Sequence, residues 1–176
     1  MSTACIGRSK WDLDTPALLL DLELLERNTV RIADRCRSCG VNWRPHTKGN
    51  KTPAIAHKLL DAGAIGITCA KLGEAEVMAA AGIRDILVAN QVVGARKITR
   101  LVNLQRQADV AVAVDNLANV EQIDQAACEA GVCVRLLIEV NTGMNRAGVE
   151  PGEPTLELAR RIAGRQGVRF AGLMTW

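Results

Sequence analysis

Short apolar runs alternate with longer amphipathic runs along most of the chain. The apolar runs are rich in Val, Ile, Leu and Ala, and residues 110–114 (Val-Ala-Val-Ala-Val) are typical of them. Strands buried on both faces of a parallel sheet show this nearly continuous hydrophobic pattern. The sequence therefore predicts strands over residues 42–46, 64–69, 85–89, 109–114, 134–140 and 169–174.

Helical periodicity fills the segments between these strands. We expect helices over about 52–62, 73–81, 94–107, 117–130 and 154–163. Thr52 is placed to cap the first of them and Pro53 suits its first turn, while Asn116 can cap the fourth. An extended run over 15–22 and a helix over about 23–38 precede these units.

The repetition of βα units predicts an α/β fold, a (β/α)8 TIM-type barrel rather than an open doubly wound sheet. No Gly-x-Gly-x-x-Gly turn or Walker-type loop follows the first strand, which disfavours a nucleotide-binding open sheet. A closed barrel has eight strands and usually about 250 residues. These 176 residues supply about six strands, so we expect an incomplete barrel, either a fragment of a longer protein or one closed by partner chains.

Charge and composition disfavour several classes of partner. The chain has 22 basic and 19 acidic residues, a net charge of +3, and the two signs are well mixed. We therefore expect no nucleic-acid partner, which would need a basic stripe or block. The longest apolar runs are strand-sized, so we expect no membrane span. The first five residues do not resemble a signal peptide, and the sequence predicts a cytoplasmic protein.

Two of the six cysteines, Cys36 and Cys39, have the spacing of a redox or zinc pair. No second pair completes a zinc site, and both fall near the end of a predicted amphipathic helix. We therefore interpret them as structural thiols and expect no metal site in the chain.

The segment 44–48 (Arg-Pro-His-Thr-Lys) places a lysine where the first predicted strand ends. Catalytic groups of βα units gather at this carboxyl end, and a lysine amine there can form a Schiff base. Lys48 shares strand parity with Arg44 and His46, so all three are expected on one side of the strand. Partial burial beside Arg44 and Arg146 would favour the neutral amine. Lys51 is expected in solvent, and a solvated loop lysine is the alternative for Lys48.

Five segments, taken together, resemble a known family. They are 44–48, 66–76, 90–94 (Asn-Gln-Val-Val-Gly), 114–116 (Val-Asp-Asn) and 139–148 (Glu-Val-Asn-Thr-Gly-Met-Asn-Arg-Ala-Gly). In this order they resemble the N-terminal domain of fold-type III pyridoxal-phosphate enzymes, the alanine racemase N-terminal kind. The D-threonine aldolase and D-serine dehydratase branch is the nearest match.

The resemblance implies roles for particular residues. Lys48 would carry pyridoxal 5'-phosphate as a Schiff base, and Arg146 would contact the phenolic oxygen of the cofactor. Glu139 would hold that arginine, as a carbamylated lysine does in many alanine racemases; a purely structural ion pair is the alternative. Trp176 is similar to an aromatic position near the cofactor.

Three further residues are candidates for the same site. His46 is interpreted either as a residue that stacks on the cofactor or transfers protons, or as a histidine bonded inside the barrel. Asn90, with Gln91 beside it, ends the third strand, where polar side chains could line the mouth. Arg44 is a supporting cation.

The resemblance also implies a domain organisation and an activity. Residues 1–14 form a lead-in and 15–176 a partial cofactor-binding barrel, while the family's C-terminal β domain with its divalent-metal site is absent from the chain. The implied activity is a lyase acting on D-3-hydroxy amino acids, with racemisation as the alternative reaction. A non-catalytic pyridoxal-phosphate homeostasis protein and an inactive fragment of an interrupted gene are alternatives. The expected partners are a small D-amino acid and a second copy in a homodimer.

Overall fold

The computed structural model describes residues 6–176, in which helices and strands alternate. The helices are α1 (Leu22–Ser38), α2 (Pro53–Asp61), α3 (Leu72–Ala80), α4 (Ala95–Leu104), α5 (Leu117–Ala130) and α6 (Glu153–Ala163), with a short 3-10 helix at Lys10–Asp12. The strands are β1 (Ile67–Cys69), β2 (Asp85–Gln91), β3 (Asp109–Val114), β4 (Val134–Val140) and β5 (Val168–Thr175). None of the helices in this part of the chain has the length and apolar character needed to cross a membrane.

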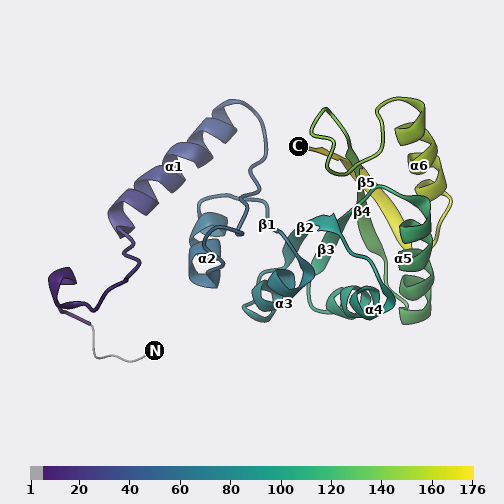
Figure 1. Cartoon of the computed structure of the whole chain (residues 1–176). Helices are drawn as coiled ribbons and strands as arrows, with labels where there is room; N and C mark the ends of the chain where they lie inside the picture. The colour runs from purple at the N-terminus through teal and green to yellow at the C-terminus, as the bar shows by residue number, and fades with distance from the viewer. Residues whose placement is uncertain (1–5) are drawn as a thin grey trace.

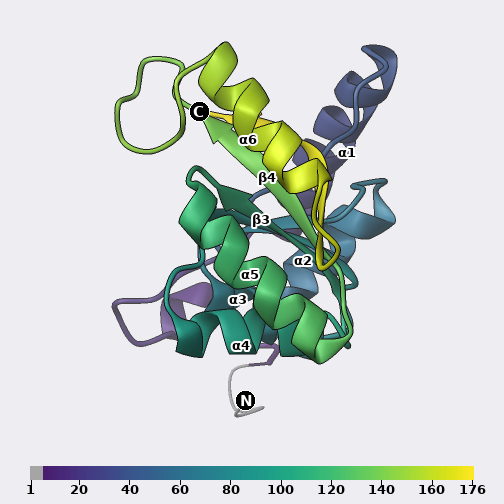
Figure 2. The same ribbon diagram turned by 90° about the vertical axis from the view of Figure 1, so that its right-hand side faces the viewer.

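The five strands form one sheet in the order β1-β2-β3-β4-β5, and every neighbouring pair is parallel. Helices α3 to α6 pack along the outer side of this sheet (Figures 1 and 2). Each helix connects two adjacent parallel strands, which is the connection of a (β/α) barrel. The predicted incomplete barrel is therefore confirmed.

The strand predicted over 42–46 is not formed as a regular strand. Its only ladder element is an isolated parallel bridge between His46 and Thr68. The Thr68 amide donates to the Pro45 carbonyl at 2.8 Å, and the Ile65 amide donates to the Trp43 carbonyl at 2.9 Å. Pro45 has no N–H to return a bond, so the ladder stays broken. The segment nevertheless lies parallel to β1 and extends the sheet on that edge.

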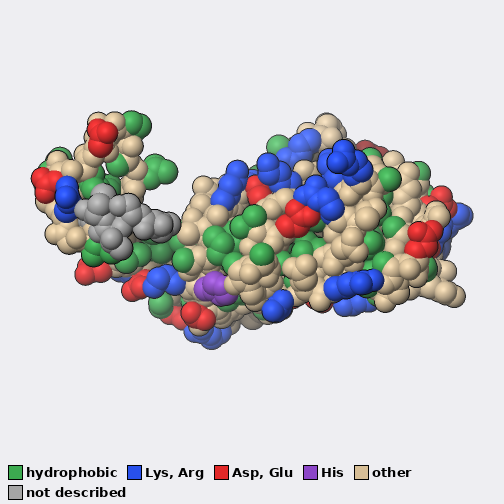
Figure 3. Space-filling view, turned by 90° about the horizontal axis from the view of Figure 1, so that it is seen from below, with side chains coloured by type: hydrophobic (Ala, Val, Ile, Leu, Met, Phe, Trp, Pro, Cys, Tyr) green, Lys and Arg blue, Asp and Glu red, His purple; other side chains and the backbone are tan. Residues whose placement is uncertain are grey.

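The N-terminal part of the described chain stands apart from the sheet (Figures 1 and 3). Helix α1 begins as predicted, with the Asp21 carboxylate accepting from the Leu24 amide at 3.0 Å. Only Thr29 and Ala33 are buried in this helix. The preceding extended run belongs to no strand, and Leu18 is fully exposed.

The hydrophobic core lies between the sheet and its outer helices. Strand β3 is buried from Val110 to Val114, as its continuous apolar sequence predicts. Buried strand residues such as Ile86 and Leu136 share one cluster with helix residues such as Leu101, Ile123 and Ile162. Strand β5 is instead mostly exposed, because it forms an edge of the sheet.

Four charged residues form an ion-pair network at the amino ends of the strands. Asp85 lies 3.1 Å from Arg44 and 2.6 Å from Arg135, and Arg135 also lies 2.7 Å from Asp109. Asp85 and Asp109 are the first residues of β2 and β3. Burial alone would raise the pKa of Asp85, but the hydrogen bonds and charges of Arg44 and Arg135 outweigh it and lower that pKa. Figure 3 views the molecule from below, where basic and acidic side chains are interspersed.

Replacing Asp85 by Asn tests this network. We expect the free energy of unfolding at pH 7 to fall by about 1–2 kcal/mol, a value reduced for the partial exposure of Asp85. Because the folded-state pKa lies below the unfolded value of about 3.9, the contribution is present above that value. It is lost as the pH falls through the lower folded-state pKa. Urea unfolding at several pH values measures both effects.

The control is Asp61→Asn at the exposed end of α2. It should change the free energy of unfolding by no more than about 0.5 kcal/mol. Equal losses in the two variants, or a loss in Asp85→Asn that does not shrink in acid, would contradict the role of the network.

Candidate functional site

A cavity of about 600 Å³ lies at the carboxyl ends of the strands. Cavities that hold small molecules have volumes of about 300–1,000 Å³, so the size suits a cofactor or metabolite. The residues that line it come from the segment before β1, from the ends of β1, β2, β4 and β5, and from the loop after β4. They are His46, Lys48, Ala70, Ala89, Asn90, Gln91, Glu139, Met144, Arg146, Ala147, Met174, Thr175 and Trp176.

Lys48 projects into this cavity from the turn that precedes α2. Its amine nitrogen lies 5.4 Å from the centre of the Trp176 ring, within cation–π distance. Lys51, three residues later, has a left-handed backbone (φ 48°), and its amine lies 3.5 Å from the Glu74 carboxylate. The structure therefore places Lys48, and not Lys51, at the cavity.

Partial burial beside Arg44 and Arg146 was the condition expected to favour a neutral Lys48 amine, and the structure meets it only in that Arg146 lines the same cavity. Lys48 is exposed to the open cavity. Arg44 is absent from the lining and lies at the amino ends of the strands, where it pairs with Asp85. Strand parity can predict which side of a strand a residue faces, but it says nothing of its depth along the barrel axis.

His46 supports the turn that carries Lys48. Its Nδ1 accepts a hydrogen bond from the Lys48 amide at 3.2 Å. Partial burial, followed by the charge of Lys48, lowers the pKa of His46, while Glu74 and the Thr68 backbone act in the opposite direction. Both the acceptor role of Nδ1 and the lowered pKa favour a neutral imidazole that carries its proton on Nε2.

Arg146 and Glu139 are brought together across the cavity wall. The Glu139 side chain is only 6% exposed at the end of β4, and its Oε1 lies 3.6 Å from Arg146 Nη2. The Arg146 side chain is 61% exposed, so its guanidinium is accessible to a ligand while one end faces the carboxylate. Trp176 and Asn90 also line the cavity, and Asn90 Nδ2 donates to the Ala70 carbonyl at 3.2 Å.

Asn141, which sequence reasoning missed, organises the loop that carries Arg146. Its Oδ1 accepts from the amides of Gly143 and Asn145, both at 3.1 Å. Its Nδ2 donates to Asn145 Oδ1 at 2.8 Å and to Glu150 Oε1 at 3.1 Å. An asparagine that accepts from amides two and four residues later is a local turn signal, so position and residue type could have indicated this role.

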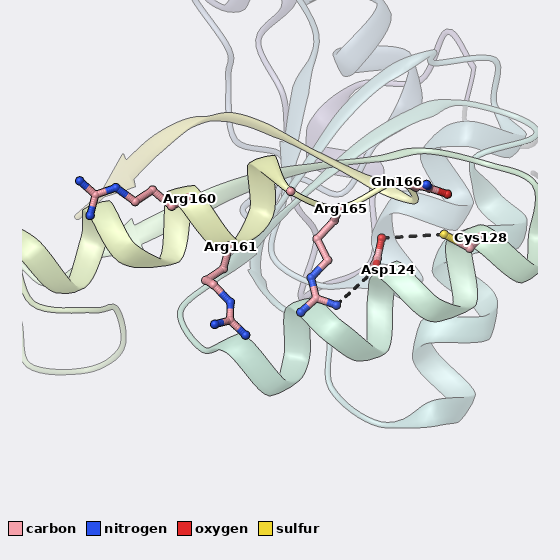
Figure 4. A pocket seen from close by; sticks show the side chains of 7 residues that line it. Asp124, Cys128, Arg160, Arg161, Arg165 and Gln166 are labelled. Atoms are coloured by element: carbon pink, nitrogen blue, oxygen red, sulfur yellow. Dashed lines mark hydrogen bonds and ion pairs between the residues drawn. The ribbon is translucent and has the colours of Figure 1, made fainter.

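A second hollow, of about 520 Å³, lies between α5 and α6 and contains three arginines (Figure 4). Their charges are paired: Arg165 lies 2.6 Å from Glu121 and 3.5 Å from Asp124. Arg160 pairs with Glu153 at 2.9 Å, and Arg161 lies 4.0 Å from Glu121. This surface therefore offers little unpaired charge to an anion, and the cavity beside Lys48 is the better candidate for a functional site.

No metal-binding cluster is found in residues 6–176: nowhere in them do three or more His, Cys, Asp or Glu side chains converge. Cys36 and Cys39 are free thiols at the end of α1.

The sheet and its cavity define the class of the molecule as an incomplete (β/α)-barrel protein, with a lysine at the carboxyl ends of its parallel strands. Residues 20–176 match the family described as alanine racemase, N-terminal domain. The chain belongs to this family.

Relatives with assigned activities cover nearly all of this chain. D-threonine aldolase from Arthrobacter sp is 42% identical over 164 residues, which are 93% of this chain and 43% of the relative. 3-hydroxy-D-aspartate aldolase from Paracoccus denitrificans (strain Pd 1222) is 34% identical over 173 residues, 97% of this chain and 44% of the relative. The crystal structure of D-threonine aldolase from Filomicrobium marinum matches with a TM-score of 0.91 at 46% identity, over 92% of this chain and 44% of that one. The chain thus spans less than half the length of each.

The lowered pKa of His46 predicts that its imidazole titrates below the ordinary value of about 6.5. Neutral His46 is favoured in the folded state, so its contribution to stability is present above about pH 6.5 and is lost as the pH falls through the lower folded-state pKa. The chain has two histidines, so NMR titration of the imidazole C2 protons, assigned with His57→Gln, measures this directly. A His46 midpoint at or above the ordinary value would contradict the interpretation.

Replacing Gly148, where the loop returns to β4, is predicted to lower the free energy of unfolding. Gly148 has φ +103°, and a Cβ there would lie 2.8 Å from the Asn141 nitrogen. Gly143 has a similar φ of +116° but nothing within 4 Å, which makes Gly143→Ala a matched control for backbone strain. We expect Gly148→Ala to cost about 1–3 kcal/mol more than Gly143→Ala in urea unfolding, because only it adds a clash. Equal costs would show that the close approach is unimportant.

Proposed function

We propose that this chain is the cofactor-binding barrel portion of a pyridoxal-phosphate-dependent lyase that acts on D-3-hydroxy amino acids. The observation that carries the proposal is the amine of Lys48. It lies in a cavity at the carboxyl ends of the strands, 5.4 Å from the Trp176 ring, in a lining that includes Arg146.

The chemistry of these side chains fits pyridoxal phosphate. A primary amine is the group that condenses with its aldehyde, and an indole offers a flat surface against which an aromatic ring can stack. A guanidinium stays charged at every physiological pH and can hold an oxyanion with fixed geometry. The residues that would hold the cofactor are therefore Lys48, Arg146, Trp176 and His46.

When bound, pyridoxal phosphate supplies an electron sink for the charge that develops as a bond to the α-carbon of the amino acid breaks. Lys48 would hold the cofactor through its aldehyde. Arg146 would hold the anionic oxygen, and Glu139 would orient Arg146. His46 keeps Nδ1 on the Lys48 amide, so its Nε2–H is the atom available to exchange a proton in the cavity.

The names of the relatives support the substrate class. D-threonine and 3-hydroxy-D-aspartate are both D-amino acids with a hydroxyl on the β-carbon. Aldol cleavage to glycine and an aldehyde is the reaction that these two names favour, with dehydration and racemisation as alternatives. The resemblance also supports a homodimer as a proposal. It supports a divalent metal as well, although residues 6–176 contain no cluster of side chains that could bind one.

Borohydride trapping tests the role of Lys48. With pyridoxal phosphate, the chain should develop an absorbance shifted from that of the free cofactor, because the aldehyde has condensed with an amine. Reduction should then fix the cofactor to the peptide that contains Lys48, as identified by mass spectrometry. Lys48→Ala should abolish this product.

Lys51→Ala is the matched control, because Lys51 is a nearby lysine whose amine faces Glu74. It should leave trapping at Lys48 intact. Trapping at Lys51, or none in the unaltered chain, would refute the proposal. Trapping without turnover of D-threonine would instead support the non-catalytic binding protein.

A further inference from the structure

Gln91 reaches the cavity because of an irregularity in strand β2. Val88 pairs with Val112 of β3, but the next paired residue is Gln91 with Ala113, so two residues of β2 are left out of the ladder. A β-bulge of this kind changes the direction of the strand and redirects side chains, and bulges are frequent beside active sites. The bulge places the Gln91 amide among the strand ends.

The Gln91 amide nitrogen bridges two carboxylates, one in β4 and one on the residue that follows β3. Its Nε2 donates to Glu139 Oε2 at 2.6 Å and to Asp115 Oδ2 at 3.1 Å. The buried Glu139 carboxylate thereby receives a hydrogen bond on one oxygen, while its other oxygen faces Arg146. A neutral donor at this place satisfies Oε2 without adding a cation that would compete with Arg146 for the carboxylate.

Asp115 links the same group to the loop that carries Arg146. Its Oδ2 accepts from the Gly148 amide at 3.1 Å as well as from Gln91. Gly148 lies close to β4, since a Cβ there would lie 2.9 Å from the Val140 carbonyl carbon and 3.0 Å from the Glu139 carbonyl oxygen. Asp115 thus fixes the end of the loop, while Gln91 holds the Glu139 carboxylate that faces the guanidinium within it.

We propose that Gln91 and Asp115 are positioning residues for Arg146, and this inference rests on the proposed function for its cofactor-dependent test. Gln91 acts through the Glu139 carboxylate, and Asp115 acts through Gln91 and the Gly148 amide. Neither needs to touch the cofactor. Their shared purpose is to hold one guanidinium against a fixed anion so that its free face meets the ligand with little loss of side-chain entropy.

The test compares Gln91→Leu, the isosteric Gln91→Glu, Glu139→Gln and the double variant Gln91→Leu/Glu139→Gln in the full chain. Gln125→Leu is the control, because Gln125 is an exposed residue of α5 that bonds only to Glu129. The dissociation constant of pyridoxal phosphate is measured by absorbance titration, and Lys48 trapping is measured at saturating cofactor. Urea unfolding of the cofactor-free variants reports their stability.

We expect Gln91→Leu and Gln91→Glu to raise the dissociation constant about tenfold, the size of one lost hydrogen bond to a charged group. Trapping at Lys48 should be unchanged at saturation. In the Glu139→Gln background, Gln91→Leu should add less than about a twofold effect, because the two residues act in series. The proposal would be overturned if the effects of Gln91→Leu and Glu139→Gln multiplied in the double variant. It would also be overturned if Gln91→Leu had a dissociation constant as low as that of Gln125→Leu.

A measurement without cofactor separates this proposal from the proposed function. A dicarbonyl reagent modifies free guanidinium groups, and mass spectrometry gives the rate at Arg146. Gln91→Leu and Asp115→Asn should each increase that rate at least about twofold, because the carboxylate and the loop no longer restrain the arginine. An unchanged rate refutes the positioning role even if Lys48 is trapped. A faster rate supports it even if the unaltered chain fails to bind pyridoxal phosphate.

Discussion

The buried carboxylate of Glu139 is the group on which the arrangement of the site depends. A charge removed from water must be compensated by hydrogen bonds or an opposite charge, or it takes up a proton. Here the compensation comes from the Gln91 amide on one oxygen and from Arg146 at 3.6 Å on the other. The need to compensate this one buried carboxylate therefore holds together the ends of β2 and β4 and the loop after β4.

The same strands serve two purposes at their two ends. At the amino ends, Asp85, Asp109 and Arg135 pair with one another and with Arg44, and these charges are largely satisfied within the protein. At the carboxyl ends, Lys48 is exposed and the Arg146 guanidinium keeps an accessible face. Charges that neutralise each other stabilise a fold, whereas charges left accessible can meet a ligand. The division follows the usual separation of stability and catalysis in (β/α) barrels.

Much of this fold could be predicted from the sequence, because its pattern is local. The apolar run at Val110–Val114 needs no tertiary information to be recognised as a buried strand, and Asn116 caps α5 as its residue type predicts, accepting from the Asn119 amide at 3.1 Å. The segment 42–46 occupies the place of a strand in the repeating βα pattern, but Pro45 removes the amide that a regular ladder needs. Likewise Thr52 occupies the cap position of α2, yet its hydroxyl donates to the Asn50 carbonyl at 2.7 Å and caps nothing.

The site was only partly predictable, because its remaining contacts depend on register and depth. Lys48, Glu139 and Arg146 could be chosen from motif and position alone. Gln91 could not be ranked above Asn90, since the strand was expected to end at residue 89 and only the bulge shows which amide turns toward Glu139. Asp115 was visible as a polar residue after a strand, but its bond to the Gly148 amide joins residues 33 positions apart.

The distance between Lys48 and Trp176 shows how the curvature of the sheet creates the cavity. Lys48 follows the segment beside β1, and Trp176 follows β5, so they come from opposite edges of the sheet. Adjacent strands lie about 4.8 Å apart, so a flat sheet of this width would separate its two edges by about 24 Å. The amine nevertheless lies 5.4 Å from the centre of the indole ring. Side-chain length covers only part of the difference, so the strand ends must curl toward one another as in a barrel. The position of the reactive amine relative to its aromatic neighbour is thus set by the twist and coiling of all the strands between them, and not by any single contact at the site.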